Sequence, residues 1–143
     1  MESRTPSGAL APTQETAWRT VADPEIVGSM RRSGRRALLD WGLEHIVEAA
    51  ELCISELVTN AVIHAVTSCP EVEVKLTLLR GCLRIGVTDG DPTGPQRRPP
   101  TAENEHGRGL VLVSLMTTAF GVDRSPIGKT VWCVLNAEEP ESA

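Results

Sequence analysis

The sequence predicts an α+β two-layer sandwich, in which a mixed, mostly antiparallel sheet packs against helices. Two observations lead to this fold class. The expected helices and the expected strand pairs occupy separate stretches of the chain, and each strand pair is joined by a short turn typical of an antiparallel hairpin. A length of 143 residues suits one domain, and a hydrophobic content of 41% suffices for one core.

The first half of the chain is expected to hold a tail, an edge strand and two helices. Residues 1–16 are rich in Pro, Ser and Thr and are predicted to form a flexible tail. Residues 17–21 resemble a short edge strand. The pair Asp23-Pro24 is typical of a helix start with Asp as the N-cap, and this helix should stop at Gly42. A second helix is predicted over residues 44–65, because apolar residues recur there at helical spacing.

The second half is predicted to hold two hairpins, with strands near residues 72–78, 83–89, 122–124 and 130–135. The first pair alternates apolar and polar residues around the turn Arg80-Gly81. Residues 90–108 are rich in Gly, Pro and Arg, and a loop of this length is usually functional or mobile. A helix is expected over residues 109–119. Residues 137–143 should form a frayed acidic tail, so the folded domain is expected over residues 17–136.

Composition argues against several classes of function. A net charge of −5 and an aromatic content of 3% disfavour direct nucleic-acid binding. No apolar run approaches the roughly 20 residues of a membrane helix, and no signal peptide is apparent, so a cytoplasmic location is expected. The four cysteines form no Cys-x-x-Cys pair and are expected to be reduced packing residues. The basic stretch at residues 31–36 is either a solvated helix face or a docking surface for an acidic partner.

Polar residues occur where the second helix and the second strand should be buried. Glu56, Asn60 and His64 are four apart, so they stack along one helical face beside the apolar stripe. They indicate either a pocket or a partly exposed face, since an unpaired buried polar group costs roughly 1–3 kcal/mol. Asp89 ends a strand directly before the segment at residues 90–94, either as a turn former or as an acceptor in a pocket.

A further motif, His106-Gly107-Arg108-Gly109-Leu110, is expected to open a helix. Two glycines at a helix N-terminus permit close approach of backbone N–H groups to an anion. One Gly-x-Gly is a weak signal, but its combination with the two preceding features in this order is a much stronger one.

Together these motifs resemble those of the GHKL ATPase superfamily, which has the Bergerat nucleotide-binding fold. The resemblance is closest to bacterial anti-sigma-factor serine kinases and related actinobacterial histidine-kinase-like ATP-binding proteins. It covers about residues 17–136. The N box of the family matches residues 56–65, the G1 box residues 89–93 and the G2 box residues 107–110, and a late Thr element matches residues 128–131.

The resemblance implies ATP and Mg²⁺ as cofactors. Glu56 would be the general base, and Asn60 would hold Mg²⁺ through its side-chain oxygen, a ligand type that this hard cation prefers. Asp89 would accept a hydrogen bond from the adenine 6-amino group, and Gly107 and Gly109 would wrap the phosphates. The other residues expected at the nucleotide are His64, Asp91, Arg108, Leu110 and Thr130, with Thr130 at the adenine edge and Arg108 at phosphate.

Some of these assignments leave alternatives open. His64 would lie near the ribose or phosphates or be structural, and Lys129 is a weaker candidate than Arg108 for phosphate contact. The implied ATP lid at residues 92–106 contains two arginines, Arg97 and Arg98, which would either close over phosphates or belong to a solvated loop.

The G1 box departs from the family pattern Asp-x-Gly-x-Gly. Asp91 and Thr93 stand where the family has glycines, and Pro92 stiffens the turn. A second carboxylate near a triphosphate is repulsive unless Mg²⁺ or an arginine screens it. This departure bears on catalytic rate, while nucleotide binding is still expected.

By resemblance, the chain would be a serine/threonine protein kinase that phosphorylates a STAS-type anti-anti-sigma antagonist and sequesters a sigma factor. Family analogy also suggests a homodimer formed through residues 18–21 and the first helix. No nucleic acid or membrane partner is expected. The altered G1 box favours a second hypothesis, a nucleotide-responsive binding module with little or no transfer activity. A third is an interaction domain that binds no nucleotide.

Overall fold

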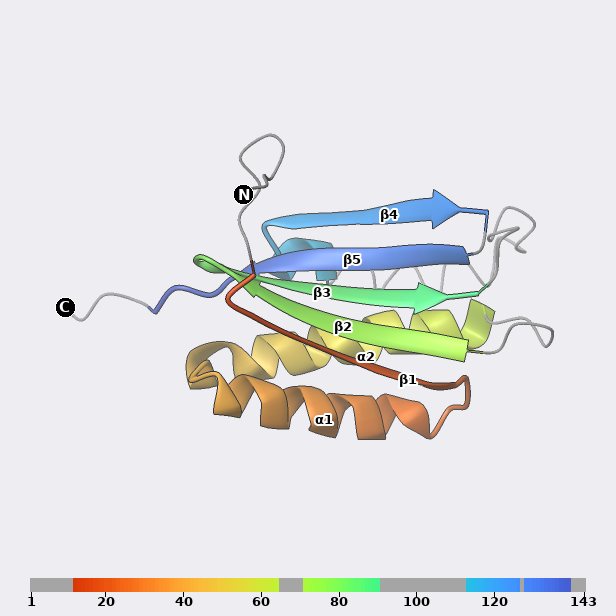
Figure 1. Ribbon diagram of the computed structural model, residues 1–143, viewed down its shortest axis with the longest axis horizontal. Coiled ribbons are helices and arrows are strands. Elements are labelled where there is room, and N and C mark those ends of the chain that lie inside the picture. Colours follow the sequence, from red (N-terminus) through yellow and green to blue (C-terminus); the bar gives the residue numbers. More distant parts are fainter. Residues whose placement is uncertain (1–11, 65–70, 91–112, 127, 140–143) are drawn as a thin grey trace, which may run out of the picture.

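A computed structural model describes residues 12–64, 71–90, 113–126 and 128–139 (Figure 1). Its elements are, in chain order, β1 (Gln14–Val21), α1 (Ile26–Asp40), the 3₁₀ turn η2 (Glu44–Ile46), α2 (Val47–His64), β2 (Glu71–Leu79), β3 (Cys82–Asp89), β4 (Ala119–Ser125) and β5 (Gly128–Asn136). The strands form one sheet in the order β1-β2-β3-β5-β4, and all described pairings are antiparallel. The predicted α+β two-layer architecture is confirmed.

The two helices lie side by side on one face of the sheet, and the other face carries no helix among the described elements (Figure 1). α1 turns residues spaced by four, from Ile26 to Leu38, into the interior, and α2 lies between α1 and strand β3. Gly34 permits the close approach of the helices, because a Cβ there would lie 2.5 Å from Ile54 Cδ1. The core therefore sits between α2 and the centre of the sheet.

Strand alternation assigns the two faces of the sheet. In β3, Leu83, Ile85 and Val87 are fully or almost fully buried against the helices, whereas Arg84 and Thr88 are half-buried on the open face. Strand β5 follows the same alternation, with Val131, Cys133 and Leu135 buried. This period of two decides which face each polar residue near the strand ends occupies.

Several boundaries differ from those the sequence predicts. β1 begins at Gln14, so residues 14–16, predicted to belong to the tail, lie in the sheet. The reason is a set of contacts with β2 that local sequence does not reveal: Thr77 Oγ1 donates to Glu15 Oε2 at 3.0 Å, and Lys75 Nζ lies 3.7 Å from the same oxygen. Helix α1 begins later than predicted, with Glu25 at the N-cap.

The second predicted helix contains a break, because residues 44–46 form a 3₁₀ turn before α2 begins at Val47. Residues 113–116 are helical, as the expected 109–119 helix implies, but β4 already starts at Ala119. Residues 109–112 of that helix lie outside the described residues. In the described part of the chain, no helix is both long and apolar enough to span a bilayer.

Candidate functional site

A buried ion pair joins the end of β3 to the start of β5. The strand register places Asp89 opposite Lys129, and Lys129 Nζ lies 2.9 Å from Asp89 Oδ2. The two side chains are only 2% and 3% exposed. They extend the helix-facing rows that Val87 and Val131 occupy in the two strands. A carboxylate and an ammonium are thus held against the helix layer at one end of the sheet.

Asn60 places an unpaired acceptor in the interior from helix α2. The residue is 5% exposed, and its Oδ1 is buried without a hydrogen-bond partner in the described part of the chain. It is one of three buried side-chain atoms in that condition among the described residues. Most buried polar groups in proteins are hydrogen-bonded, so this oxygen needs an explanation. An amide oxygen of this kind suits Mg²⁺, which prefers oxygen ligands.

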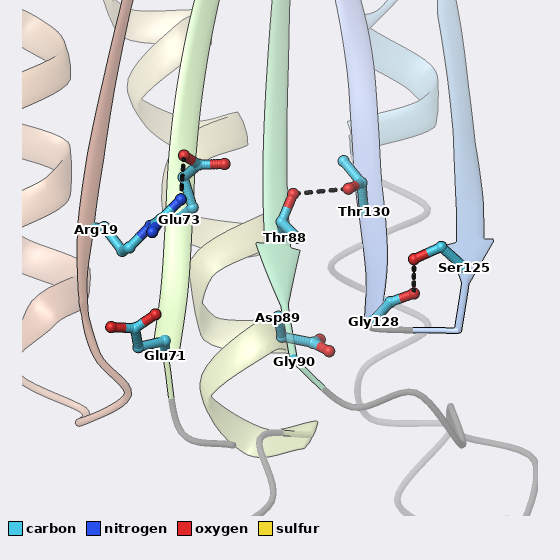
Figure 2. A pocket seen from close by; sticks show the side chains of 9 residues that line it. All are labelled: Arg19, Glu71, Glu73, Thr88, Asp89, Gly90, Ser125, Gly128 and Thr130. Atoms are coloured by element: carbon cyan, nitrogen blue, oxygen red, sulfur yellow. Dashed lines mark hydrogen bonds and ion pairs between the residues drawn. The ribbon is translucent and has the colours of Figure 1, made fainter.

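The fold brings Asn60 and Asp89 to the same end of the molecule. α2 ends at His64, and the chain re-enters the sheet at Glu71, whose neighbour Val72 is paired with Asp89. α2 packs directly on β3, and its last turns lie behind the end of that strand (Figures 1 and 2). A polar site between the end of α2 and the ends of β3 and β5 is therefore possible in this fold.

Glu56 lies one helical turn before Asn60 and is half-buried. The N-box residues thus share a continuous α-helix, as their spacing of four predicts. His64 is the last residue of that helix, but its side chain lies outside the described residues.

Two buried thiols connect α2 to β5 beside this site. Cys53 and Cys133 are both free and fully inaccessible. The hydrogen bond with Cys53, together with burial, raises the pKa of Cys133 well above its ordinary value of 9.0. Cys133 is therefore a neutral thiol at physiological pH.

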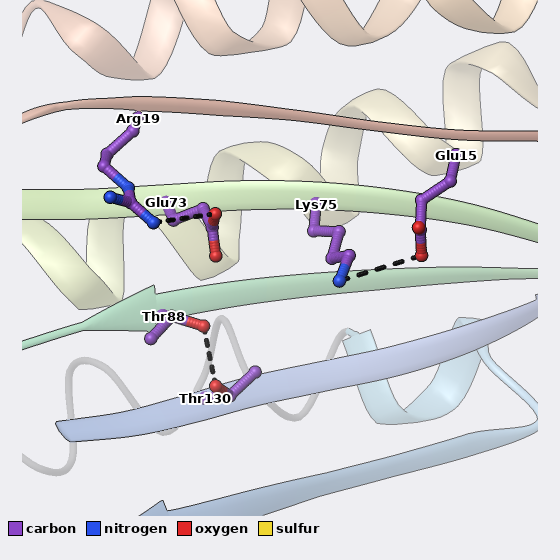
Figure 3. A network of polar contacts seen from close by, with 6 residues as sticks. All are labelled: Glu15, Arg19, Glu73, Lys75, Thr88 and Thr130. Atoms are coloured by element: carbon purple, nitrogen blue, oxygen red, sulfur yellow. Dashed lines mark hydrogen bonds and ion pairs between the residues drawn. The ribbon is translucent and has the colours of Figure 1, made fainter. Parts of the chain in front are cut away.

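Thr130 lies on the opposite face of the sheet from the Asp89–Lys129 pair. It is paired with Thr88 across β3 and β5, and the two hydroxyl oxygens are 2.6 Å apart (Figure 3). Thr130 and Asp89 nevertheless line the same cavity at the strand ends, and the place of Thr130 at the adenine edge stays a prediction. The residue beside Asp89 is Lys129, which the sequence analysis named only as a weaker candidate for phosphate contact. The alternation of Val131, Cys133 and Leu135 was the signal that assigns position 129 to the buried face.

The open face has its own polar features near the same strand ends. A cavity of about 390 Å³ is lined by Arg19, Glu71, Glu73, Thr88, Asp89, Gly90, Ser125, Gly128 and Thr130 (Figure 2). Arg19 Nη2 lies 3.5 Å from Glu73 Oε2, and Lys75 reaches Glu15 farther along the face (Figure 3). These ion pairs are solvent-exposed, and pairs of this kind contribute little to stability.

The rest of the predicted site cannot be placed. Asp91, the G2-box residues Gly107, Arg108, Gly109 and Leu110, and the lid arginines Arg97 and Arg98 lie outside the described residues. The described part of the candidate site comprises four residues: Glu56, Asn60, Asp89 and Lys129. Among the described residues no cluster of three or more His, Cys, Asp or Glu could hold a metal ion. The donor set fits Mg²⁺ that takes one protein oxygen and completes its coordination with phosphate oxygens and waters.

Comparison with known proteins settles the family. Residues 20–135 match the model of the histidine kinase-like ATPase domain. The chain belongs to this family. The predicted membership of the GHKL superfamily is thereby confirmed. ATP binding is the property that an ATPase domain of this family implies.

Two relatives illustrate the range of the family. This ATPase domain is 34% identical to the uncharacterized protein SCO4941 of Streptomyces coelicolor over 90 residues, which are 61% of this chain and 85% of that protein. It superimposes on the crystal structure of the RsbU and RsbW domains of Rv1364c from Mycobacterium tuberculosis with a TM-score of 0.70. That match has 21% identity and covers 91% of this chain. The ATPase domain spans about a third of the solved chain, at 34%, so the match shows the shared fold.

Proposed function

We propose that this ATPase domain is an ATP- and Mg²⁺-dependent serine/threonine protein kinase of the anti-sigma type. Its substrate would be a hydroxyl group on a STAS-type anti-anti-sigma protein, and its second partner would be a sigma factor. The observation that carries the proposal is that two side chains with buried hydrogen-bond acceptors lie at the same end of the sheet. Asp89 offers a carboxylate for the exocyclic amine of adenine, and Asn60 Oδ1 offers an unpaired oxygen for the cation that accompanies the phosphates.

Glu56 is the proposed general base. The partner's hydroxyl oxygen forms a bond to the γ-phosphorus while the bond from that phosphorus to the bridging oxygen breaks, so ADP leaves. The hydroxyl proton passes to the Glu56 carboxylate. Mg²⁺, when bound, supplies charge neutralisation at the phosphates, and Asn60 would hold it. Phosphoryl transfer depends mainly on this positioning and charge neutralisation.

The proposed regulatory logic follows from the charge that the reaction adds. A phosphate on the antagonist introduces a charge of about −1.5 to −2 into its interface with the kinase. The phosphorylated antagonist would dissociate, and the surface would become available to the sigma factor. The likeness to a chain containing RsbU and RsbW domains supports this partnership.

The test is phosphoryl transfer from γ-labelled ATP to STAS-domain proteins encoded in the same genome. Glu56→Gln should lower the transfer rate about 10²- to 10⁴-fold, the usual contribution of a general base, while ATP binding stays within about twofold. Glu48→Gln is the matched control, because Glu48 is an exposed residue on the same helix. Equal transfer by Glu56→Gln and wild type would reject Glu56 as the base. If no STAS protein is labelled, the kinase proposal fails.

A nucleotide-responsive binding module is the second candidate. Two observations favour it: Asp91 and Thr93 replace the family's glycines, and Lys129 already occupies the Asp89 carboxylate. Calorimetry separates this candidate from the kinase. ATP binding that changes the affinity for a protein partner, without ADP formation or phosphoprotein, would support the module.

A further inference from the structure

We propose that Lys129 is a second base-reading residue of this site. Its ammonium, held on Asp89, donates a hydrogen bond to ring nitrogen N1 of adenine while Asp89 accepts one from the 6-amino group. This inference rests on the proposed nucleotide site and adds to it a specificity-determining residue that the family motifs do not include.

The first observation is the incomplete hydrogen bonding of the Lys129 ammonium. A lysine ammonium has three N–H donors and no acceptor. Lys129 is 3% exposed, and Asp89 Oδ2 is the acceptor that the described part of the chain gives it. Lysine is almost never this buried unless it is paired, and an unsatisfied buried donor is unfavourable. Two donors of this ammonium therefore need an acceptor that the described residues do not supply.

The second observation is the kind of neighbour that surrounds the pair. Val87 precedes Asp89 by two residues, and Val131 follows Lys129 by two, so both rows are otherwise apolar. Replacing a buried ion pair by well-packed apolar residues is often neutral or stabilising. The stability of the fold therefore does not explain why a charged pair is present here. Binding of a polar ligand at this end of the sheet would explain it.

The third observation is that Asn60 lacks a hydrogen-bond donor, whereas Lys129 lacks acceptors. Its Oδ1 is a buried acceptor without a partner among the described residues, and it lies on α2 at the same end of the sheet. Unsatisfied donors on β5 and an unsatisfied acceptor on α2 would be matched by a ligand that carries acceptors of its own and an accompanying cation. A nucleoside triphosphate with Mg²⁺ has both.

The hydrogen-bonding groups of adenine match those of the Asp89–Lys129 pair. The pairing edge of adenine has an amino donor at C6 next to an acceptor at N1. A carboxylate and an ammonium 2.9 Å apart present an acceptor beside a donor, which is the complementary order. An ionised carboxylate offers about four acceptor positions, so Asp89 can hold the ammonium and the amine together.

The experiment is a binding cycle that removes the contact from each side. Calorimetry compares Mg-ATP with Mg-1-deaza-ATP, which lacks the N1 acceptor but keeps the 6-amino group, on wild type and on Lys129→Met. Wild type should bind the deaza analogue about 10- to 100-fold more weakly, the range for a hydrogen bond from a charged donor. Lys129→Met should bind ATP more weakly by a similar factor and should no longer distinguish the two nucleotides. Lys75→Met, which changes an exposed lysine on the open face, should behave as wild type.

A second measurement needs no variant at position 129. Lys75 and Lys129 are the two lysines of the chain, so Lys75→Arg leaves one side-chain ammonium signal in a ¹H–¹⁵N spectrum. ATP should shift that signal, and saturating 1-deaza-ATP should shift it much less.

The outcomes are distinct. If wild type binds ATP and 1-deaza-ATP equally, Lys129 does not read N1 and the inference is overturned while the nucleotide site stands. The same holds if Lys129→Met loses equal affinity for both nucleotides, or if it binds ATP more tightly because the lysine merely obstructs Asp89. If wild type binds neither nucleotide, the proposed function itself fails.

Discussion

Replacing Asn60 by leucine should stabilise the nucleotide-free protein and abolish its response to Mg-ATP. Asn60 is 5% exposed, and its buried Oδ1 has no partner in the described residues. An unsatisfied buried acceptor costs about 1–3 kcal/mol. Leucine has the same number of side-chain heavy atoms and the same branching, carries no polar atom and is a better helix former by a few tenths of a kcal/mol. The expected gain in the free energy of unfolding is therefore about 1–3 kcal/mol.

Thermal unfolding with and without nucleotide measures both effects. For a domain of this length, 1 kcal/mol corresponds to a change in Tm of roughly 3–5 °C, so Asn60→Leu should melt about 3–15 °C higher than wild type. Mg-ATP at 100 times its Kd should add about 2.7 kcal/mol to wild type and nothing to the variant. Raised stability together with lost binding would show that Asn60 serves ligand binding and lowers the stability of the fold.

Thr77→Val is the matched control for a buried polar group that has a partner. Thr77 is 8% exposed, and its hydroxyl donates to Glu15 Oε2 at 3.0 Å. Its replacement should lower the free energy of unfolding by about 0.5–1.5 kcal/mol. If Asn60→Leu is destabilised in the same way, Oδ1 is satisfied in solution, and the reasoning that assigns it to a cation is refuted.

Three further predictions concern the same end of the sheet. Asp89→Leu should lower the free energy of unfolding in urea by about 3–5 kcal/mol, because it leaves a buried ammonium unpaired. Adding Lys129→Met should restore most of that loss, and equal losses in the single and double variants would contradict a coupled pair. Gly128→Ala should lose about 1–3 kcal/mol, since its Cβ would overlap the Asp89 carbonyl oxygen at a φ of +155°, and a variant as stable as wild type would show that the strand end can shift. The hydrogen bond with Cys53, together with burial, raises the pKa of Cys133 above 9.0. The stability that depends on this thiol is therefore complete below pH 9.0 and falls, by up to about 1.4 kcal/mol per pH unit, as the pH rises beyond it. Cys133→Val alone leaves the buried thiol of Cys53, so the double variant Cys53→Ala with Cys133→Val should remove that alkaline fall, and an unchanged pH profile would show that these thiols do not titrate differently in the folded protein.

The sequence predicted the parts of this fold whose information is local. The spacing of Glu56 and Asn60 by four assigned them to one helix face, and the alternation along residues 83–89 placed a carboxylate at a strand end. The extension of β1 to Gln14 was not predictable in this way, because it depends on contacts between Glu15 and a strand more than 60 positions later.

The ion pair between Asp89 and Lys129 was not predicted, for a different reason. The family motif drew attention to Thr130, although a period of two counted back from Cys133 and Val131 assigns Lys129 to the buried face. Burial periodicity therefore predicts that Lys129 faces the helices, which the resemblance does not address. It identifies which side chain of β5 enters the interior beside Asp89.

The end of the sheet where β3 stops and β5 begins holds buried polar groups that the proposed nucleotide would satisfy. Among the described residues, the acceptor on Asn60 and two donors on Lys129 are buried without partners, and each such group lowers stability. A ligand that brings a cation to the first and an acceptor to the second would relieve both penalties in one binding event. Because those penalties are present before binding, their relief adds to the affinity for any ligand that has both features. A ligand with only one of them gains only part of that affinity, so the same unsatisfied groups that lower the stability of the fold would also make the proposed site selective.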